Sequence, residues 1–490
     1  MFKIVEGNSQ GLPDVEWFVR LLGTLPDSLR SFFDPDSDVM VTRAPGRLDV
    51  MGGIADYSGS LVLEMPIAEA TFAAIQKNSS EKVEIVSIDH DGERLFNFDM
   101  RLSDLLLDWQ LLDLALAKDY FAKTAGGGWA SYVAGAFFVL AKELGFRFES
   151  GSRIVVASHV PIGKGVSSSA ALEVATMQAV CVAYEIDVPP RDLALLCQLV
   201  ENRVVGAACG VMDQITSHCG EAGKLTSIVC QPAEIQGRLD VPDNVEFWGI
   251  DSGVRHAVSG SDYSSVRTGA FMGYRIIAEL AGLQVRHVSD GVVEIDGTRW
   301  QGYLANVNPE EYEQEFRHQM PETLNGQEFL SNYQGITDPV TSVDPAKIYA
   351  INAPAEHAIY ENRRVHKFAD LMTLPANDDH LAEAGELMFG SHESYKACGL
   401  TESRTDRIVE LVRTSRDQGL FGARITGGGS GGTVAVLARR GSGKAILGLV
   451  DRLASEMGEK HQVFHGSSPG CSLFGHLRLG RDQNARKVAE

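Results

Sequence analysis

The sequence lacks the features that mark membrane, secreted and nucleic-acid-binding proteins. No apolar stretch reaches membrane-spanning length, and the N-terminus MFKIVEGNSQGLPDVEWF lacks the basic start and apolar run of a secretory signal. With 65 acidic against 44 basic residues the formal charge is -21, which disfavours a phosphate backbone or an anionic membrane as partner. We therefore expect a soluble, cytoplasmic protein that binds neither nucleic acid nor membrane.

Cysteine is scarce and scattered. The 7 cysteines stand singly, without CxxC pairs or the cysteine and histidine clusters of a zinc site. Their odd number argues against a closed set of disulfides, so reduced cysteines that serve packing are expected. Internal repeats and low-complexity tracts are also missing. The length of 490 residues is enough for two or three domains.

Strand-like and helix-like patterns alternate along the chain and predict a mixed α+β architecture. A helical lead-in at residues 1–38 precedes a strand at 39–43, and IVVAS, PIGKGVSSS and AALEVATMQAVCVAY indicate a strand, a loop and a helix. VEFWGIDS is typical of a buried strand, and residues 266–283 of a helix. We divide the chain into the lead-in, a first domain at 39–245, a second at 246–479 and a polar tail at 480–490.

Three further segments complete this interpretation. DRIVELVRTSRDQGLFG predicts an amphipathic helix that is closed by Gly419 or Gly422. ARITGGGSGGTVAVLA predicts a strand, a glycine turn and a second strand. Residues 309–345 are polar and acidic without strong periodicity, and we expect them to pack as short helices over a core.

The segment PIGKGVSSSAALE, residues 161–173, combines glycine, lysine and serine between the expected strand and helix. Glycines let the backbone approach a ligand, and the start of a helix attracts anions. Lys164 adds a mobile positive charge, and the Ser169 hydroxyl is an oxygen ligand of the kind that Mg²⁺ prefers. The GxxxxGK[ST] order of a Walker A loop is absent, so a flexible turn capped by serine explains this segment equally well.

A carboxylate, Asp213, follows a turn at Gly210 in ENRVVGAACGVMDQITS. Phosphoryl transfer to a hydroxyl needs a group that accepts the proton, a cation that offsets developing charge, and a metal on the phosphates. Asp213 could serve the first need, Arg47 the second, and Ser169 with Glu201 the third. A helix cap at Asp213 and a solvated charge at Glu201 remain the alternative, because spacing alone does not decide.

Two more glycine-rich segments carry candidate residues. RAPGRLDVMGGIADYSGS, residues 43–60, contains polar groups suited to fixing a polyol, namely Arg47, Asp49, Asp56 and Tyr57. Its alternative is a strand and turn with ordinary surface charges. TGGGSGG, residues 426–432, lets the backbone approach a ligand at Gly427, Gly428 and Gly429, or is a plain hairpin turn.

Together, RAPGRLDVMGG, PIGKGVSSSAA and ITGGGSGG resemble, in this order, the three motifs of the GHMP kinase family. CGVMDQ resembles the catalytic segment of the galactokinase-like branch, and DSGVRHAVSGSDYSSVR its substrate-contacting segment. The likeness runs from about residue 39 to 478. It implies two α+β domains, the first like the second domain of ribosomal protein S5 and the second ferredoxin-like, with ATP and a sugar in the cleft between them.

The resemblance also implies roles for individual residues. Asp213 is the catalytic base, Arg47 is its stabilising partner, and Ser169 and Glu201 are the Mg²⁺ ligands. The phosphate cradle comprises Gly163, Lys164, Gly165, Val166, Ser167, Ser168 and Ser169. The sugar site comprises Gly53, Ile54, Asp56, Tyr57, Gly210 and Tyr263.

One departure from the galactokinase pattern bears on the sugar. Galactokinases carry Glu-His after the first-motif glycine to hold the 6-hydroxyl, whereas this sequence has Gly53-Ile54. L-Arabinopyranose has the hydroxyl arrangement of galactopyranose without C6, and Ile54 could fill the vacated space. A lost polar partner costs a buried hydroxyl about 1 to 3 kcal/mol. With further likeness to L-arabinokinases in GRLDVMGGIADYSGSLVL and GSSPGCSLFGHLRL, this favours L-arabinose as substrate.

Two alternatives stay open. A galactokinase, or a 1-kinase for a 6-deoxy sugar or a uronate, would use the same chemistry, although the first motif offers no cation beyond Arg47 for a uronate. A non-catalytic sensor of sugar and ATP is the alternative of a different class, and the joint presence of Arg47, Ser169, Glu201 and Asp213 argues against it.

Overall fold

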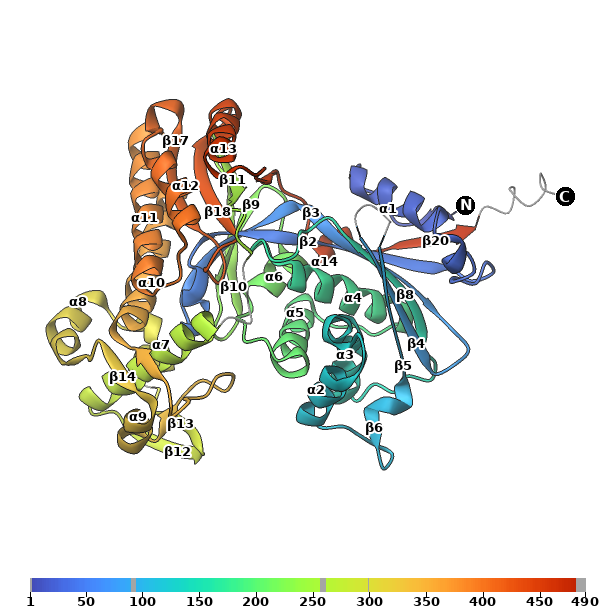
Figure 1. The fold of residues 1–490 in the computed structure, drawn as a ribbon, viewed down its shortest axis with the longest axis horizontal. Helices are drawn as coiled ribbons and strands as arrows, with labels where there is room; N and C mark the ends of the chain where they lie inside the picture. Colours follow the sequence, from blue (N-terminus) through green and yellow to red (C-terminus); the bar gives the residue numbers. More distant parts are fainter. Residues whose placement is uncertain (1, 90–93, 256–260, 298, 482–490) are drawn as a thin grey trace.

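The computed structural model describes residues 2–89, 94–255, 261–297 and 299–481. Two larger sheets with their helices make up most of it, and a group of short elements flanks the second sheet (Figure 1). Residues 256–260, which belong to the predicted substrate-contacting segment, lie outside the described residues. The same holds for residues 482–490 of the predicted tail. The predicted α+β class is confirmed.

The larger sheet has nine strands in the part of the chain that the structure describes. Its path is β1-β20-β2-β3-β8-β4-β5, and β9 with β10 continues from the far end of the long strand β3. Only β4 and β8 pair in parallel among these strands as described. The strands are β1 (Phe2–Glu6), β2 (Val39–Met51), β3 (Leu61–Lys77), β4 (Lys82–Ile88), β5 (Leu95–Arg101), β8 (Ser152–Ser158), β9 (Lys224–Val229), β10 (Glu234–Asp240) and β20 (Leu477–Arg481).

Helices cover both faces of this sheet. Alternating residues of β3 and β8 point to opposite faces, so Ile75 and Ile154 pack under the helices after β5, while Phe72 and Val155 pack against α1. Figure 1 shows α1 on the side of the sheet opposite to α3 and α4. The helices are α1 (Pro13–Gly23), α2 (Leu114–Lys123), α3 (Gly127–Leu144), α4 (Ser168–Tyr184), α5 (Pro190–Leu199) and α6 (Met212–Cys219).

The first glycine-rich motif is mostly strand rather than loop. β2 continues through RAPGRLDVM to Met51, with irregularities in its pairing to β3 near Pro45 and Asp49. Proline is tolerated at this point because β20 pairs with β2 only from Val39 to Val41, so the other edge of β2 needs no amide from Pro45. A short 3-10 helix, Gly53–Ser58, carries the remainder of the motif.

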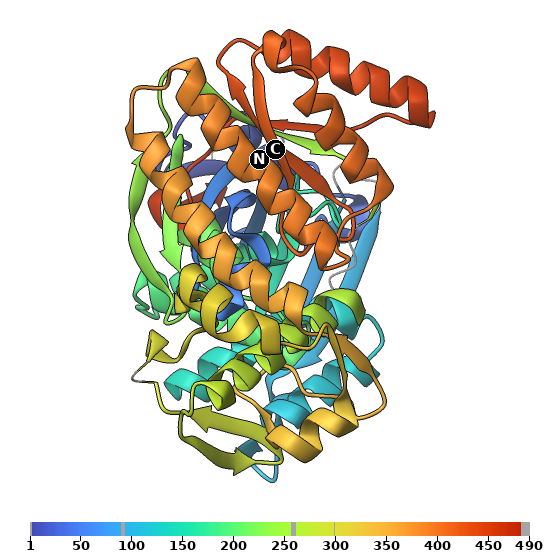
Figure 2. The same ribbon diagram turned by 90° about the vertical axis from the view of Figure 1, so that its left-hand side faces the viewer.

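The second sheet has the order β17-β18-β11-β19, and each described pair is antiparallel. In chain order, β11, helices, β17, β18, α13 and β19 follow the β-α-β-β-α-β sequence of a ferredoxin-like unit, as the resemblance implies. The long helices α10 and α11 run side by side across the front of Figure 2. The elements are β11 (Val245–Asp251), β17 (Leu420–Ile425), β18 (Thr433–Arg439), β19 (Val463–His465), α7 (Ser261–Leu280), α10 (Asn352–Thr373), α11 (Asp378–Ala397), α12 (Ser403–Arg413), α13 (Gly443–Met457) and α14 (Cys471–Phe474).

The amphipathic helix predicted from DRIVELVRTSRDQGLFG is shorter than expected. α12 ends at Arg413, and Gly419, in the left-handed conformation with φ +85°, precedes β17 instead of closing the helix. Gly422 lies within β17, where an added Cβ would approach the Cα of Gly385 in α11 to 2.4 Å. The glycine therefore serves close helix-to-strand packing, which local sequence does not reveal.

Residues 283–350 form the short elements that flank α7. As expected for residues 309–345, short helices pack around a core, here the buried rings of Tyr312, Phe316 and Phe329, and short strands accompany them. Its members are β12 (Val285–Ser289), β13 (Gly291–Ile295), α8 (Pro309–Glu311), β14 (Thr323–Asn325), α9 (Gly326–Tyr333), β15 (Gly335–Ile336) and β16 (Ile348–Ala350).

Strand pairing qualifies the proposed domain division. β1 belongs to the predicted helical lead-in, yet it pairs with β20, which in turn pairs with β2 of the larger sheet. The division near residue 245 stays a proposal.

None of the described helices combines the length and the hydropathy that crossing a bilayer requires. All seven cysteines are unpaired, and all except Cys209 are buried, as predicted.

Candidate active site

The serine loop leads from β8 into α4. Gly163 and Gly165 adopt left-handed φ values of +74° and +71°, and Ser167 adopts +61° at the N-cap of the helix. Ser168 and Ser169 are the first two helical residues, so their amides lack intrahelical partners. These amides and the helix dipole favour an anion at this point, as the sequence predicts.

Lys164 lies apart from the other residues of the predicted cradle. Its ammonium nitrogen lies 2.6 Å from Asp251 Oδ2 at the end of β11. Gly163, Gly165 and Ser167 to Ser169 line the central cavity, whereas Lys164 and the buried Val166 do not. The cation that the sequence predicts for the phosphates is therefore paired with a carboxylate of the second sheet.

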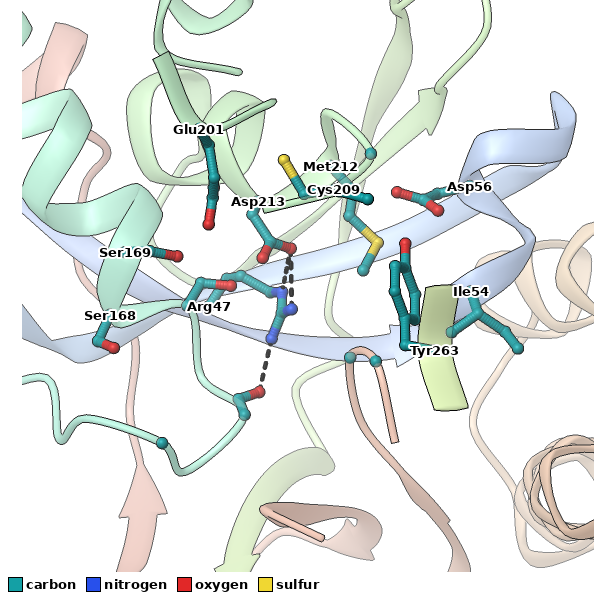
Figure 3. A pocket seen from close by; sticks show the side chains of 17 residues that line it. Arg47, Ile54, Asp56, Ser168, Ser169, Glu201, Cys209, Met212, Asp213 and Tyr263 are labelled. Atoms are coloured by element: carbon teal, nitrogen blue, oxygen red, sulfur yellow. Dashed lines mark hydrogen bonds and ion pairs between the residues drawn. The ribbon is translucent and has the colours of Figure 1, made fainter. Parts of the chain in front are cut away.

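Arg47 holds the candidate base. Its Nε and Nη2 atoms both lie 2.8 Å from Asp213 Oδ1, and its Nη1 donates to the Gly165 carbonyl at 2.8 Å (Figure 3). Arg47 is 3% exposed, and the Asp213 side chain retains 21% exposure to the cavity. Glu64 lies 3.3 Å behind the guanidinium, and burial raises the pKa of that carboxyl well above its usual range. Arg47 thus joins Asp213 to the serine loop.

The residues predicted to hold metal meet beside Asp213. Glu201 lies in a turn of π-helix, Val200–Val205, after α5, and its carboxyl interacts with the Ser169 hydroxyl. Gln214 Nε2 donates to Glu201 Oε2 at 2.7 Å and to Glu173 Oε2 at 3.2 Å. Burial, and next the charge of Asp213, raise the pKa of Glu201 to about 7. The helix breaks between Glu201 and Asp213, so folding of the loop, not one helical face, unites them.

The donor chemistry at this point fits a hard cation. A hydroxyl and a carboxylate oxygen are ligands that Mg²⁺ accepts, and Mg²⁺ commonly completes its shell with water and substrate phosphates. Within the described ranges, no group of three or more His, Cys, Asp or Glu side chains is arranged to hold a metal by itself. One oxygen of the neighbouring Glu173 is buried and has no hydrogen-bond partner in the described part of the chain, and burial raises the pKa of this carboxyl well above its usual range.

The opposite side of the cavity is lined by Ile54, Asp56 and Tyr263. Asp56 is 1% exposed, and a Cβ on Gly210 would lie 1.4 Å from its Oδ2, so only glycine allows this approach. Burial raises the pKa of Asp56 to about 7, although the nearby Arg267 lowers it in part. The predicted Tyr57 lies behind this wall, with its ring centroid 6.1 Å from that of Tyr263.

A buried ion pair supports the Asp56 side. Arg267 of α7 donates to both oxygens of Asp338, at 2.7 and 2.9 Å, and both residues are buried. A third bond of 3.2 Å runs from Arg267 Nη1 to the carbonyl of Cys209, directly before Gly210. Asp338 also accepts hydrogen bonds from residues 340 and 341. Through Arg267, the polar segment 309–345 is therefore linked to the loop that precedes α6, the helix that carries Asp213.

The third glycine motif closes the cavity. Gly427 and Gly428 line it, and the Gly427 amide donates to Asp49 Oδ2 at 2.9 Å. Gly429 faces away, because a Cβ on it would approach the carbonyl oxygen of Leu400 to 2.6 Å. Gly53 is also outside the lining and packs against Tyr395. Asp49 is thus a structural anchor that joins the first motif to the third.

An apolar cavity adjoins the serine loop and shares Gly163, Ser168, Ser169 and Glu201 with the first. Aromatic and aliphatic side chains make its walls, and sequence reasoning identified none of them. Ile162 and Leu172 belong to the serine-loop motif but were not predicted to line a cavity, and no motif marks the other walls; Ile162 is 82% exposed and Phe96 51%. The apolar lining includes Ile88, Phe96, Trp129, Tyr132, Ile162 and Leu172.

Three family models match the sequence. The GHMP kinases N terminal domain covers residues 131–221, and the GHMP kinases C terminal model covers residues 373–454. The galactokinase galactose-binding signature covers residues 29–77, which include the first glycine motif. The matches bear out the family resemblance and its two-domain fold.

Curated relatives agree with this assignment. An L-arabinokinase of Arabidopsis thaliana is 42% identical over 541 aligned positions, which cover 98% of this chain and 52% of that protein. The chain thus spans about half the length of this relative. A galactokinase of Chloroflexus aggregans is 29% identical and covers 81% of this chain and 83% of its own length.

Solved structures share the fold. The Lactococcus lactis galactokinase, crystallised with galactose, superposes with a TM-score of 0.68 at 19% identity and covers 91% of this chain and 97% of its own. The Methanococcus jannaschii mevalonate kinase superposes with a TM-score of 0.50 at 16% identity and covers 88% of this chain and 98% of its own.

Proposed function

The chain belongs to the GHMP kinase family, and from this premise we propose that it transfers the γ-phosphoryl group of ATP to the anomeric hydroxyl of L-arabinose. The products are β-L-arabinose 1-phosphate and ADP. One observation carries the proposal: residues of all three glycine motifs line a single cavity together with Asp213. The name of the Arabidopsis relative supports the choice of sugar.

The chemistry needs a proton acceptor beside the attacking oxygen. Asp213, 21% exposed to the cavity and held by Arg47, accepts the proton of the C1 hydroxyl as that oxygen attacks phosphorus. The bond from phosphorus to the β,γ-bridging oxygen breaks, and ADP leaves with that electron pair. Arg47 holds the base in place and offsets negative charge, because its guanidinium joins Asp213 to the serine loop.

The serine loop is the proposed phosphate site. Amides at the start of α4 have no acceptor within the helix, which supports their binding the triphosphate. We assign Ser169 and Glu201 as ligands of a divalent cation, Mg²⁺, which neutralises charge on the β- and γ-phosphates when it is bound. The adjoining apolar cavity takes the adenine base, because aromatic and aliphatic walls suit a flat, weakly polar ring.

Ile54 supports L-arabinose over galactose. Its side chain is 1% exposed and lines the cavity with Asp56 and Tyr263. An apolar wall offers no partner to the hydroxymethyl group of galactose, whereas L-arabinopyranose presents no such group. Asp56 supplies a carboxylate for the sugar hydroxyls. A cytoplasmic location, from which ATP and a free sugar are both accessible, remains part of the proposal.

The test is a comparison of substrates. Release of ADP in the presence of Mg²⁺ is measured with L-arabinose, D-galactose, D-fucose and D-galacturonate, and the position of the phosphate is determined by NMR. We expect the highest kcat/KM for L-arabinose and a phosphate on C1. A preference for galactose overturns the interpretation of Ile54, and failure to release ADP with any aldose favours a protein that only binds sugar and ATP.

A further inference from the structure

Tyr395 of α11 joins two loops of the active site from behind. Its hydroxyl accepts a hydrogen bond from the Ile54 amide at 2.7 Å and donates one to the Gly427 carbonyl at 2.8 Å. A phenol has one proton to donate, and here that proton goes to the third glycine motif. Tyr395 is 0% exposed, whereas Ile54 and Gly427 both line the cavity. The bridge therefore acts on the cavity wall without entering the cavity.

Gly53 leaves the space that this hydroxyl occupies. A Cβ at Gly53 would lie 1.7 Å from Tyr395 Oη, 2.8 Å from Tyr395 Cζ and 2.5 Å from Arg424 Nη2. Its φ of +48° also lies in the left-handed region that disfavours most side chains. The tyrosine hydroxyl thus stands where a side chain at position 53 would begin, and Ile54 is left to form the wall.

Buried polar groups hold this arrangement in place. Arg424 donates to Asp49 Oδ1 at 2.8 Å and to the Ser391 hydroxyl oxygen at 3.0 Å, and its guanidinium carbon lies 5.1 Å from the centre of the Tyr395 ring. Asp49 accepts from the amides of both Gly53 and Gly427. The same two loops are therefore tied twice, once through Asp49 and once through Tyr395.

We propose that Tyr395, with Gly53, is a positioning and specificity-determining pair for the sugar. The pair occupies the volume next to Ile54 and fixes the Ile54 backbone, so the wall stays apolar and close to the position of C5 of the sugar. This inference rests on the proposed function. It adds a residue of the second domain that touches neither sugar nor ATP and that acts through the backbone of two loops.

Tyr395→Phe is the first test, because it keeps the ring and removes both hydrogen bonds. We expect KM for L-arabinose to rise about tenfold, equivalent to about 1.4 kcal/mol, with kcat and KM for ATP changed less than about threefold. We also expect the L-arabinose preference over D-galactose to fall. Tyr274→Phe is the matched control, because that tyrosine is also buried and its hydroxyl has no hydrogen-bond partner among the residues that the structure describes.

The outcomes of this test are distinct. An equal rise of KM for ATP and for the sugar would assign Tyr395 a structural role and overturn the proposal. An unchanged ratio of kcat/KM for L-arabinose to that for D-galactose would do so as well. An effect of Tyr274→Phe equal to that of Tyr395→Phe would do the same. If the unaltered protein phosphorylates neither sugar, the proposed function itself fails, and the specificity assignment falls with it.

A second test needs no turnover. The thermal unfolding midpoint is measured for Gly53→Ala, Tyr395→Phe and the double variant. Removal of Oη relieves the 1.7 Å approach between that atom and a Cβ at position 53. We therefore expect the unfolding midpoint of the double variant to fall by clearly less than the sum of the decreases in the two single variants. Additive losses would show that the hydroxyl does not occupy the space of position 53. This readout separates an error about the pair from an error about the reaction.

Discussion

The phosphate side and the sugar side of the cavity are built in different ways. The phosphate side consists mainly of one continuous segment, residues 161–169, whose backbone amides meet at the start of α4, and Glu201 joins it from the π-helix after α5. The sugar side combines the 3-10 helix Gly53–Ser58 with α7, α11 and the β17–β18 turn, and buried ion pairs hold it together. The phosphate side therefore offers mainly backbone groups to a ligand, whereas the shape of the sugar side depends on side chains that are distant in the sequence.

This difference has a consequence for substitutions. On the phosphate side, we expect amides to supply much of the binding, and a side-chain change leaves them in place. On the sugar side, Arg267, Asp338, Arg424 and Asp49 are buried charges, and removing one leaves its partner uncompensated. We therefore expect sugar-side variants to change stability and sugar affinity together.

The largest expected effect is that of Asp213→Asn at the boundary between the two sides. Loss of the proton acceptor lowers kcat by about 10²- to 10⁴-fold, while sugar and ATP still bind. Turnover is followed by ADP release and binding by calorimetry.

Asp187→Asn serves as control for Asp213→Asn, because that aspartate is exposed after α4. Normal turnover of Asp213→Asn would remove Asp213 from the role of base.

Asp338→Asn tests the sugar side. Arg267 loses its charged partner, and breaking a buried pair costs about 3 to 5 kcal/mol of unfolding free energy. Urea denaturation measures this loss. We also expect KM for the sugar to rise more than KM for ATP, because Arg267 holds the Cys209 carbonyl beside Gly210 and Asp56.

Asp344→Asn is the matched control for Asp338→Asn. This aspartate is exposed in the same segment, and among the described contacts its side chain accepts only a local bond from the Ala346 amide. Similar losses of stability in both variants would contradict a special role for the Arg267 pair.

The dependence of the metal requirement on pH tests the phosphate side. Burial and the charge of Asp213 raise the pKa of Glu201 to about 7, and only the carboxylate form ligates a cation. Protonation below pH 7 therefore competes with Mg²⁺. Between pH 8 and pH 6 we expect the half-saturating concentration of free Mg²⁺ to rise about tenfold, as one titrating group requires.

Glu201→Gln supplies the comparison for the pH experiment. It should need more Mg²⁺ at every pH and lose most of the pH dependence. An unchanged pH dependence in this variant would assign the titration to another group.

Lys164→Met is expected to have the smallest effect. Its ammonium is paired with Asp251 outside the cavity lining, so KM for ATP should change by less than about threefold, in line with a partly exposed ion pair. Steady-state kinetics with varied ATP measure the change. A rise of tenfold or more would show that Lys164 leaves Asp251 to contact the phosphates.

Much of the phosphate side was predictable, because its residues are neighbours in sequence. The strand, loop and helix around Ser167 to Ser169 follow from local propensity and match the structure. Lys164 shows the limit, since nothing near it in sequence reveals Asp251, 87 positions later. The extended β2 and the strand β17 around Gly422 have the same origin, because pairing with β3 and packing of β17 against α11 override the local pattern.

The sequence by itself determined the α+β class, the glycine motifs and the segment that we propose to bind an anion through its amides, because these depend on residues within a few positions of each other. Only the tertiary structure decided which buried charges are paired, which glycines are obligatory and that Tyr395 stands behind Ile54. The reason is that a buried polar group must find its partner in space, and the chain supplies that partner from 71 positions away for Arg267 and 341 for the Ile54 amide.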